Sequence, residues 1–138
     1  MQKQWTSRTP NYFFTVFGGG NRPPVGGRHY PHHRGHIISK DMQAGDVMLL
    51  YCGADYPKSE YSQKAPGIGI VVDIETNGRE EVIYQYFPLE HPVSLANLRA
   101  NIPEIKDHEP LNLVGNWLFQ IARKSFRDTL KGRQIYWP

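Results

Sequence analysis

The sequence of 138 residues predicts an α+β fold, in which a curled mixed sheet forms a small barrel flanked by short helices. Two observations predict this class. Short aromatic and β-branched segments recur along the chain, separated by stretches rich in glycine, proline and asparagine. Helical patterns are few and short. The length corresponds to about one domain, and no repeat or low-complexity linker divides the chain, so we expect a single domain over 1–138.

The first two expected strands are separated by a long loop. Tyr12–Phe17 is aromatic and β-branched, and it ends at three glycines. Residues 18–35 are predicted to form a loop rich in glycine, proline and histidine, and 37–43 fits a short helical turn. Val47–Cys52 is a second strand, whose lack of alternation indicates that it is largely buried. A second long loop is expected over 53–66.

A hairpin is expected next, because Asn77-Gly78 is a strong turn signal. It predicts that Ile68–Ile74 and Val82–Phe87 pair as antiparallel strands. Gly67 and Gly69 lie at the start of this hairpin, and glycine within a strand pattern suggests a bulge or a close backbone approach.

The last third of the chain is predicted to hold two short helices and two strands. The first helix begins at Ser94, which can cap it, and is stopped by Pro103. Trp117–Ile121 is expected to be a strand and Ala122–Leu130 a helix with an apolar i,i+4 pair. Gln134–Trp137 fits a final edge strand.

Charge is distributed unevenly along the chain. The first forty residues contain six Lys/Arg, no Asp or Glu and four of the six histidines, whereas 41–138 contain ten basic and thirteen acidic residues. The basic stretch is mostly loop and rich in glycine, so backbone N–H groups can approach phosphates or a nucleobase. The charge asymmetry therefore predicts an anion-binding surface.

Composition also indicates the cellular compartment in which the protein is expected. The longest apolar runs have about five residues, far fewer than the ~20 that span a bilayer, so no membrane partner is expected. The N-terminus lacks the apolar core of a signal peptide, and the single cysteine excludes an internal disulfide. We therefore expect a cytoplasmic protein.

The segment His29–His36 holds four histidines within eight residues. One interpretation is a transition-metal site, but no cysteine or carboxylate lies within the segment and two arginines would repel a cation. A polar loop with one or two packed histidines is the simpler interpretation. A third is that these rings stack on bases while nearby arginines contact phosphates. Composition does not decide between the last two.

Motifs for catalysis are lacking. The sequence contains no nucleophile elbow, no zinc-protease helix motif and no P-loop. Cys52 ends an apolar strand and is expected to be a buried small hydrophobe rather than a nucleophile. Asp41 and Asp46 flank a turn and are expected to cap it. We therefore expect a protein that is not an enzyme, with no catalytic residue, no metal site and no cofactor.

Aromatic residues fall into two groups. Those in strands are expected in the core. Tyr12, Phe13, Phe14 and Phe17 should alternate between the two faces of the first strand, and Trp117 and Phe119 should share one face of theirs, with Leu118 on the other. Tyr30, Tyr56 and Tyr61 instead lie in long loops, where aromatic side chains are often binding elements.

A second basic run lies on and after the last helix, opposed only by Asp128. Its members are Arg123, Lys124, Arg127, Lys131 and Arg133. It fits either a solvated helix face or a rim that follows phosphates.

The order of these segments resembles the EVE domain, a member of the PUA-like superfamily and a relative of the YTH domain. The resemblance covers roughly 11–131 and rests on the strand Gly45–Tyr51, the strand Gly67–Val72 and the entry to a helix at Pro92–Leu95. It implies a PUA-like open β-barrel of mostly antiparallel strands with flanking short helices, and a pocket for one extruded base. YTH domains recognise N6-methyladenine in RNA, and EVE-type domains are thought to read modified bases, often in DNA and often fused to restriction-type nucleases.

The resemblance also places the site. It puts the pocket at the end of the first strand and in the loop that follows, with the loop before the third strand as a lid. The expected pocket residues are Phe17, Gly18, Gly19, Asn21, Arg28, His29, Tyr30, His33, Tyr56, Tyr61 and Trp117. The expected phosphate rim is formed by Arg22, Arg34, Lys40, Arg123, Lys124 and Arg127. YTH domains hold the base between tryptophans, whereas this loop offers His29 and Tyr30.

The expected function is therefore non-catalytic binding of DNA or RNA that carries a modified, in the first instance methylated, base. Two alternatives remain open at this point. One is a metal-dependent enzyme that uses the histidine loop to act on a nucleotide or small molecule. The other is a protein-interaction module of a restriction or toxin system, with a nuclease or effector protein as its partner.

Overall fold

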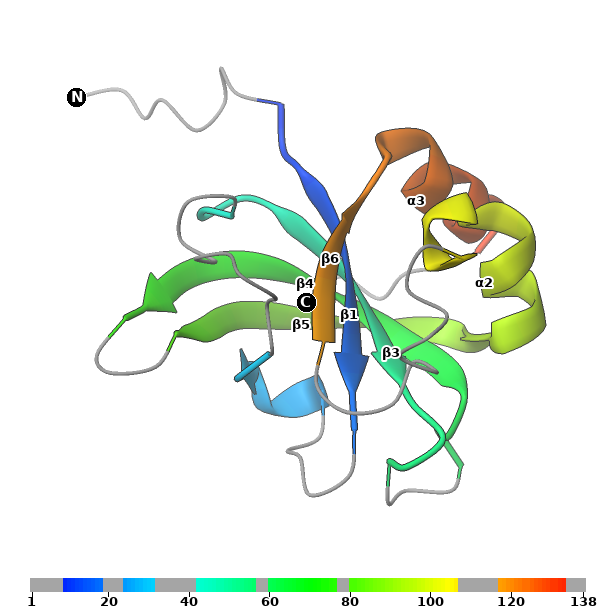
Figure 1. Ribbon diagram of the computed structural model, residues 1–138, viewed down its shortest axis with the longest axis horizontal. Helices are drawn as coiled ribbons and strands as arrows, with labels where there is room; N and C mark the ends of the chain where they lie inside the picture. Colours follow the sequence, from blue (N-terminus) through cyan, green and yellow to red (C-terminus); the bar gives the residue numbers. More distant parts are fainter. Residues whose placement is uncertain are drawn as a thin grey trace.

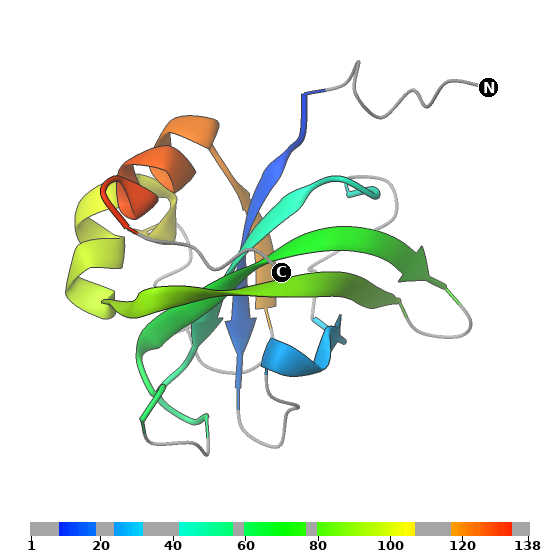
Figure 2. The same cartoon turned by 180° about the vertical axis from the view of Figure 1, so that it is seen from behind.

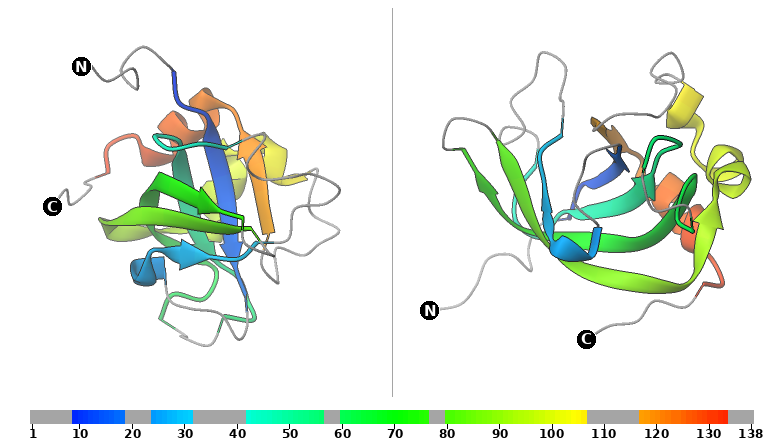
Figure 3. Two further views of the ribbon diagram at one scale, coloured as in Figure 1. Left: turned by 90° about the vertical axis from the view of Figure 1, so that its left-hand side faces the viewer. Right: turned by 90° about the horizontal axis from the view of Figure 1, so that it is seen from below.

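The structure, a computed structural model, describes residues 9–18, 24–31, 42–56, 60–76, 80–106 and 117–133. In these residues, six strands form one sheet in the order β2-β5-β4-β3-β1-β6. Two α-helices lie side by side at one end of the sheet (Figures 1 and 2). The sheet is curled rather than flat, as the view from below shows (Figure 3). The predicted α+β class, with a curled and mostly antiparallel sheet, is confirmed.

The elements occupy the following ranges: β1 Tyr12–Phe17, a 3-10 turn η2 Pro24–Gly26, β2 Arg28–His29, β3 Val47–Cys52, β4 Lys64–Glu75, β5 Glu81–Ser94, α2 Leu95–Asn101, β6 Trp117–Ile121 and α3 Arg123–Leu130. β1 runs parallel to β3 and antiparallel to β6. The pairs β3–β4, β4–β5 and β2–β5 are antiparallel. The predicted bounds of β1, β3 and β6 are confirmed, and Ser94 caps α2 by accepting a hydrogen bond from Asn97 N–H at 3.3 Å.

The central hairpin is longer than predicted. Its pairing extends from Lys64 opposite Ser94 to Glu75 opposite Glu81, with irregular register after Ala65 and after Val71. The strand β5 continues through its two prolines because, beyond Tyr84, β4 is its only described neighbour, and an edge strand tolerates proline. The predicted bulge near the two glycines is confirmed.

Two loop predictions need correction. The loop 18–35 contains η2 and β2, and the loop 53–66 ends where β4 begins at Lys64. A strand of two residues is too short to leave a pattern in the sequence, and it is held by tertiary contacts instead. Met42 and Gln43 are not helical, and the rest of the predicted helical turn lies outside the described residues, as does the strand expected over 134–137.

The two faces of the sheet carry separate apolar clusters. Successive residues of β1 alternate between them, as predicted for Phe13, Phe14 and Phe17. The helix-side core lies between the sheet and the helices, and it includes Phe14, Val16, Leu49, Tyr51, Phe87, Leu98, Ile102 and Phe119. The inner core lies within the curl, and it includes Phe13, Phe17, Met42, Met48, Leu50, Cys52, Tyr56, Val71, Val82, Tyr84 and Leu118.

A buried carboxylate fixes the turn before β3. Asp46 Oδ2 accepts a hydrogen bond from Gln43 N–H and Oδ1 accepts one from Asn11 N–H, each at 2.9 Å. Asp46 thereby ties this turn to the start of β1, and its predicted capping role is confirmed, whereas Asp41 lies outside the described residues. Within the described chain, neither helix is long and apolar enough to cross a bilayer.

Candidate functional site

The curl of the sheet brings β2 against the end of β1. The rings of Phe17 and His29 lie with their centroids 4.1 Å apart, and both side chains are buried. β2 is held in this position because Tyr84 N–H donates to Gly27 O at 2.9 Å and His29 pairs with Val82. Two predicted pocket residues, far apart in the sheet order, therefore meet inside the curl.

Two tyrosines of β5 lie on the same inner face. The ring of Tyr84 lies against Gly69, where an added Cβ would be 2.7 Å from Cδ2 of the ring. The ring of Tyr86 lies against Gly67 in the same way, 2.7 Å from the position of an added Cβ. The glycines of β4 therefore make room for two rings that pack directly onto its backbone, which is the close approach that the sequence predicted.

The loop between β3 and β4 adds two further rings. It starts beside the end of β1, because Gly53 N–H donates to Phe17 O at 2.9 Å. Tyr56 is buried in the inner core and Tyr61 is half-buried against it. We call Tyr56, Tyr61, Tyr84 and Tyr86 the tyrosine cluster. Its two members from the loop were predicted site residues, whereas its two members from β5 were not.

Three phenols of the tyrosine cluster and the neighbouring Cys52 thiol have raised pKa values. Burial raises the pKa of the Cys52 thiol to about 12. Burial, with smaller contributions from Cys52, Tyr61 and Glu60, raises the pKa of Tyr56 to about 12. The pKa values of Tyr84 and Tyr86 are also raised, first by burial and then by neighbouring phenols and the thiol. These three phenols and the thiol are thus neutral at pH 7 and are not activated as a nucleophile or general base.

A buried hydroxyl lies on the same inner face of the sheet. Thr15 precedes Phe17 by two residues on β1, so it belongs to the inner face, and it is fully buried. Its Oγ1 has no hydrogen-bond partner among the described residues. A buried hydroxyl in this state is rare enough in folded proteins to need an explanation.

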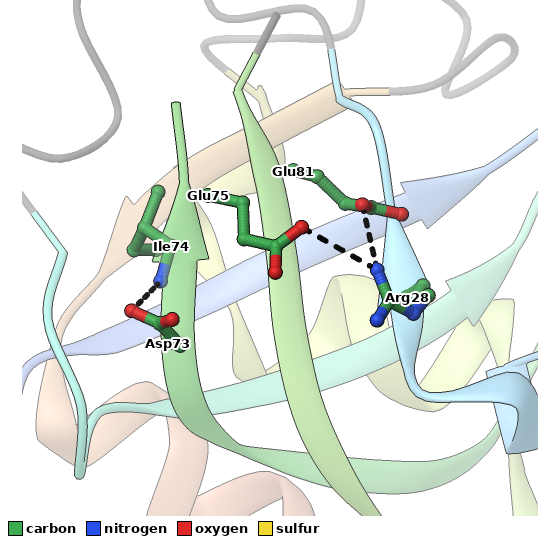
Figure 4. Close-up of polar contacts among 5 residues, drawn as sticks. All are labelled: Arg28, Asp73, Ile74, Glu75 and Glu81. Carbon is green, nitrogen blue, oxygen red and sulfur yellow. Dashed lines mark hydrogen bonds and ion pairs between the residues drawn. The ribbon is translucent and has the colours of Figure 1, made fainter. Parts of the chain in front are cut away.

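Arg28 does not join the pocket that the sequence predicted. It neighbours His29 on β2 and therefore points to the opposite face, where Nη1 lies 2.9 Å from Glu81 Oε1 and 3.6 Å from Glu75 Oε1 (Figure 4). Glu75 and Glu81 stand directly opposite each other in the hairpin. Arg28 therefore neutralises two facing carboxylates, a structural role that the sequence pattern does not reveal.

Trp117 is also separated from the predicted pocket. It pairs with Val16 in the sheet and packs on the helix-side core, whereas Phe17 belongs to the inner core. The sheet itself lies between the two side chains. The predicted sharing of a face by Trp117 and Phe119, with Leu118 on the other, is confirmed, and that alternation removes Trp117 from the inner site.

The remaining predicted residues are distributed as follows. Gly18 is buried directly after Phe17, and Tyr30 is half-buried directly after β2. The exposed residues Arg123, Lys124 and Arg127 lie on α3, away from the inner face. Gly19, Asn21, Arg22, His33, Arg34 and Lys40 lie outside the described residues.

Metal binding by the histidine segment is not tested by the described part of the chain. Within that part, no three side chains of His, Cys, Asp or Glu gather in a way that would hold a metal ion. His32, His33 and His36 lie outside it. His29, the histidine of the segment that the structure describes, is packed against Phe17.

Comparison with known proteins supports the fold. No protein-family model and no curated protein matches the sequence. Among solved structures, the crystal structure of protein Atu2648 from Agrobacterium tumefaciens, a structural-genomics target, is similar to this chain with a TM-score of 0.57. The sequence identity is 13%, and the match covers 88% of this chain and 91% of that chain. At this identity, the similarity concerns the arrangement of strands and helices alone.

Proposed function

We propose that this protein is a non-catalytic nucleic-acid-binding domain that accommodates one modified base at the inner end of its curled sheet. The observation that carries the proposal is the gathering of the tyrosine cluster with Phe17 and His29, beside the end of β1. Flat rings are the chemistry that stacks on an extruded base, and each stack contributes ~1–3 kcal/mol. Extrusion itself costs a few kcal/mol, so the ring contacts need phosphate contacts beside them.

Access to the site is provided by its half-buried members. Tyr30, Tyr61 and Tyr86 retain partial exposure, whereas Phe17 and His29 are fully packed. In the proposed complex, the base stacks on the half-buried tyrosines and the Phe17–His29 pair forms the floor beneath it. The phenols of Tyr86 and Tyr56 are neutral at pH 7, and burial raises their pKa values further, so they do not repel the phosphates that flank the base.

We also propose that the chain is related to the EVE domain family. The order of motifs resembles the EVE domain, and a curled, mostly antiparallel sheet with two short helices is compatible with the PUA-like open barrel that this resemblance implies. The partner is accordingly DNA or RNA with a modified base, acting with or without a nuclease or effector protein.

The test is a titration with fluorescent oligonucleotides at low salt, in which a central adenine or cytosine is either methylated or unmodified. We expect tighter binding of a methylated probe. Absence of binding to every probe, or equal binding of all of them, contradicts the proposed function. Tyr61→Leu and Tyr86→Leu each remove one ring, and each is expected to weaken binding of the preferred probe by roughly 5- to 150-fold.

Trp117→Leu is the matched control for these variants. It also removes a half-buried aromatic ring near the same end of β1, but from the opposite face of the sheet. Its loss of stability should be comparable, while discrimination between methylated and unmodified probes stays as in the original protein. If Trp117→Leu abolished discrimination and the tyrosine variants retained it, the site would lie on the helix side.

Thr15→Val tests whether the buried hydroxyl takes part in recognition. Valine has nearly the same shape, and removing an unpaired buried hydroxyl is neutral or stabilising by about 1 kcal/mol. If Thr15 Oγ1 hydrogen-bonds a polar edge of the base, the variant gains stability in urea unfolding but loses affinity for the modified probe. Unchanged affinity would exclude Thr15 from the site.

A further inference from the structure

The helix pair carries a charge opposite to that of the sheet. In the described part of the chain, 95–106 and 117–133 contain seven Lys/Arg and two Asp/Glu, a net charge of +5. The described residues outside these segments contain two Lys/Arg and eight Asp/Glu, a net charge of −6. In the described residues, the two helical segments are therefore positive and the rest, which includes most of the sheet, is negative. This charge separation is distinct from the basic character of the first forty residues.

Both carboxylates of the helix pair are already engaged. Glu104 accepts hydrogen bonds from Ala122 N–H at 2.6 Å and from Ser125 Oγ at 2.8 Å. Asp128 accepts a hydrogen bond from Lys124 Nζ at 2.6 Å. Asp128 also interacts electrostatically with Arg127 and Lys131, but two carboxylates do not balance the seven cations of these segments.

α3 presents its cations to solvent because its apolar side faces the sheet. Phe126 packs on Tyr12, with ring centroids 4.8 Å apart, and Ser125 and Thr129 are buried. Arg123 and Arg127 are exposed and one helical turn apart, about 6 Å along the axis. This spacing is comparable with that of successive phosphates along a nucleic-acid strand.

Grooves flank the helix pair and carry further cations. One groove of about 390 Å³ is lined by Arg99, Ile102, Ile105 and Lys106. Another, of about 380 Å³, is lined by Lys131 and Arg133 but also by Glu90 and Asp128. Arg99 and Lys106 therefore add positive charge beside α2, whereas the second groove has a mixed charge.

We propose that this helical face, centred on Arg123 and Arg127, contacts the sugar-phosphate backbone of the nucleic acid at a distance from the base site; this inference rests on the proposed function. Two features favour a phosphate backbone over a protein or a membrane. They are the positive charge of the face and its lack of exposed large apolar side chains among the described residues. Among the described residues, the exposed large hydrophobic side chains are Val25 and Val72, and neither belongs to the helices. A protein interface has an apolar core and a membrane-binding helix has an apolar face, whereas a phosphate backbone requires neither.

The length of β1 sets the separation of the two sites. Tyr12 at its start contacts α3, and Phe17 at its end contacts His29. Six residues of extended strand place these contacts about 17 Å apart. A duplex rises about 3.4 Å per base pair, so a probe must extend roughly five base pairs beyond the modified base before it reaches the helical face. Arg123 and Arg127 thus form a separate contact rather than the rim of the pocket.

The test combines Arg123→Gln and Arg127→Gln in the full chain and measures affinity for a long duplex over a series of salt concentrations. We expect weaker binding of methylated and unmodified probes by the same factor. The slope of log affinity against log salt should become shallower by about 1.8, because two phosphate contacts are lost. Both side chains are exposed, so thermal unfolding should be unchanged and serves as the check on folding.

The matched control is Arg123→Lys combined with Arg127→Lys, which keeps both positive charges at the same positions of α3. It should bind as the original protein does. A probe that ends about two base pairs from the modified base should show no difference between the arginine variant and the original protein. The arginine variant is expected to weaken binding of methylated and unmodified probes equally. A protein that does not discriminate between bases can therefore be told apart from a helical face that does not contact phosphates.

Three outcomes overturn the inference. The first is an unchanged salt slope in the arginine variant. The second is an equal loss of affinity for short and long probes, which would place both arginines beside the pocket. The third is binding of polyglutamate or anionic lipid vesicles as tightly as of the duplex, which would assign the face to an acidic protein or to a membrane.

Discussion

The ring of Tyr84 rests on the backbone of Gly69, at a distance that leaves no room for a side chain. A Cβ at position 69 would lie 2.7 Å from Tyr84 Cδ2 and 3.2 Å from Met48 Cε. Tyr84 in turn donates a hydrogen bond to Pro24 O at 2.5 Å, so the ring is fixed from both sides. This contact joins the central hairpin to the segment that leads into β2 and His29.

Gly69→Ala is therefore expected to destabilise the fold by about 1–3 kcal/mol, because the added methyl group overpacks the inner core. Urea unfolding measures the change. Gly26→Ala is the control, because that glycine has nothing within 4 Å of its Cβ position and no positive φ. The control should be nearly neutral, and an equal loss of stability in both variants would contradict the argument from the tyrosine ring.

Arg28→Met tests the ion pair between β2 and the hairpin. Without the guanidinium, the half-exposed Glu75 and the buried Glu81 face each other as like charges. We expect a loss of about 1–2 kcal/mol in the free energy of unfolding, reduced from the value of a buried pair because Arg28 is partly exposed.

A double-mutant cycle separates this effect from simple loss of packing. In a Glu75→Gln and Glu81→Gln background, the repulsion is absent, so Arg28→Met should cost little. An undiminished cost in that background would show that the aliphatic part of Arg28, rather than its charge, stabilises β2.

The strands that sequence reasoning predicted with correct bounds are those with a strong local pattern. β1 is an aromatic and β-branched segment and β3 an uninterrupted apolar one, and both end beside glycine, while β6 is defined by Trp117 and Phe119 alternating with Leu118. By contrast, β2 has two residues, and it depends on its bonds to β5 and on the packing of His29 against Phe17. Contacts of that kind join distant parts of the chain and leave no local pattern.

The candidate site was partly predictable for the same reason. Tyr56 and Tyr61 are predictable because they lie in a loop, whereas the position of Tyr84 and Tyr86 in a strand predicts core packing alone. A signal was present, because alternating tyrosines on one strand face alternating glycines, Gly67 and Gly69, on its partner. The predicted position of Arg28 in the pocket is wrong because its partners, Glu75 and Glu81, are about fifty residues away in the sequence and leave no local pattern.

Glu104→Gln is expected to loosen the junction of the two helices. The carboxylate accepts from Ala122 N–H at the start of α3 and from Ser125 Oγ, so one of two charge-assisted hydrogen bonds is lost. We expect a loss of about 1–2 kcal/mol at neutral pH, measured by urea unfolding.

The same carboxylate predicts a dependence on acid pH. Burial acts to raise the pKa of Glu104, but its hydrogen bonds outweigh burial and hold the pKa below the usual value of 4.5. The stability that Glu104 contributes is therefore present above the pKa of the unfolded chain and is lost as pH falls through the lower, folded value. The difference between the original protein and Glu104→Gln should shrink between about pH 6 and about pH 3, and a constant difference would contradict this role.

Alkaline pH should destabilise the inner core through its thiol and phenols. The pKa of Cys52 is raised from 9.0 to about 12, and that of Tyr56 from 10.0 to about 12, in each case mainly by burial. The unfolded chain loses these protons first, so the stability they contribute is complete below the unfolded values and is lost as pH rises through the folded ones. Urea unfolding between pH 9 and about pH 12 should show a steep decline, which Cys52→Ala and Tyr56→Phe each make shallower. A native thiol that reacts with iodoacetamide at neutral pH as fast as in urea would contradict this account, because alkylation requires the thiolate.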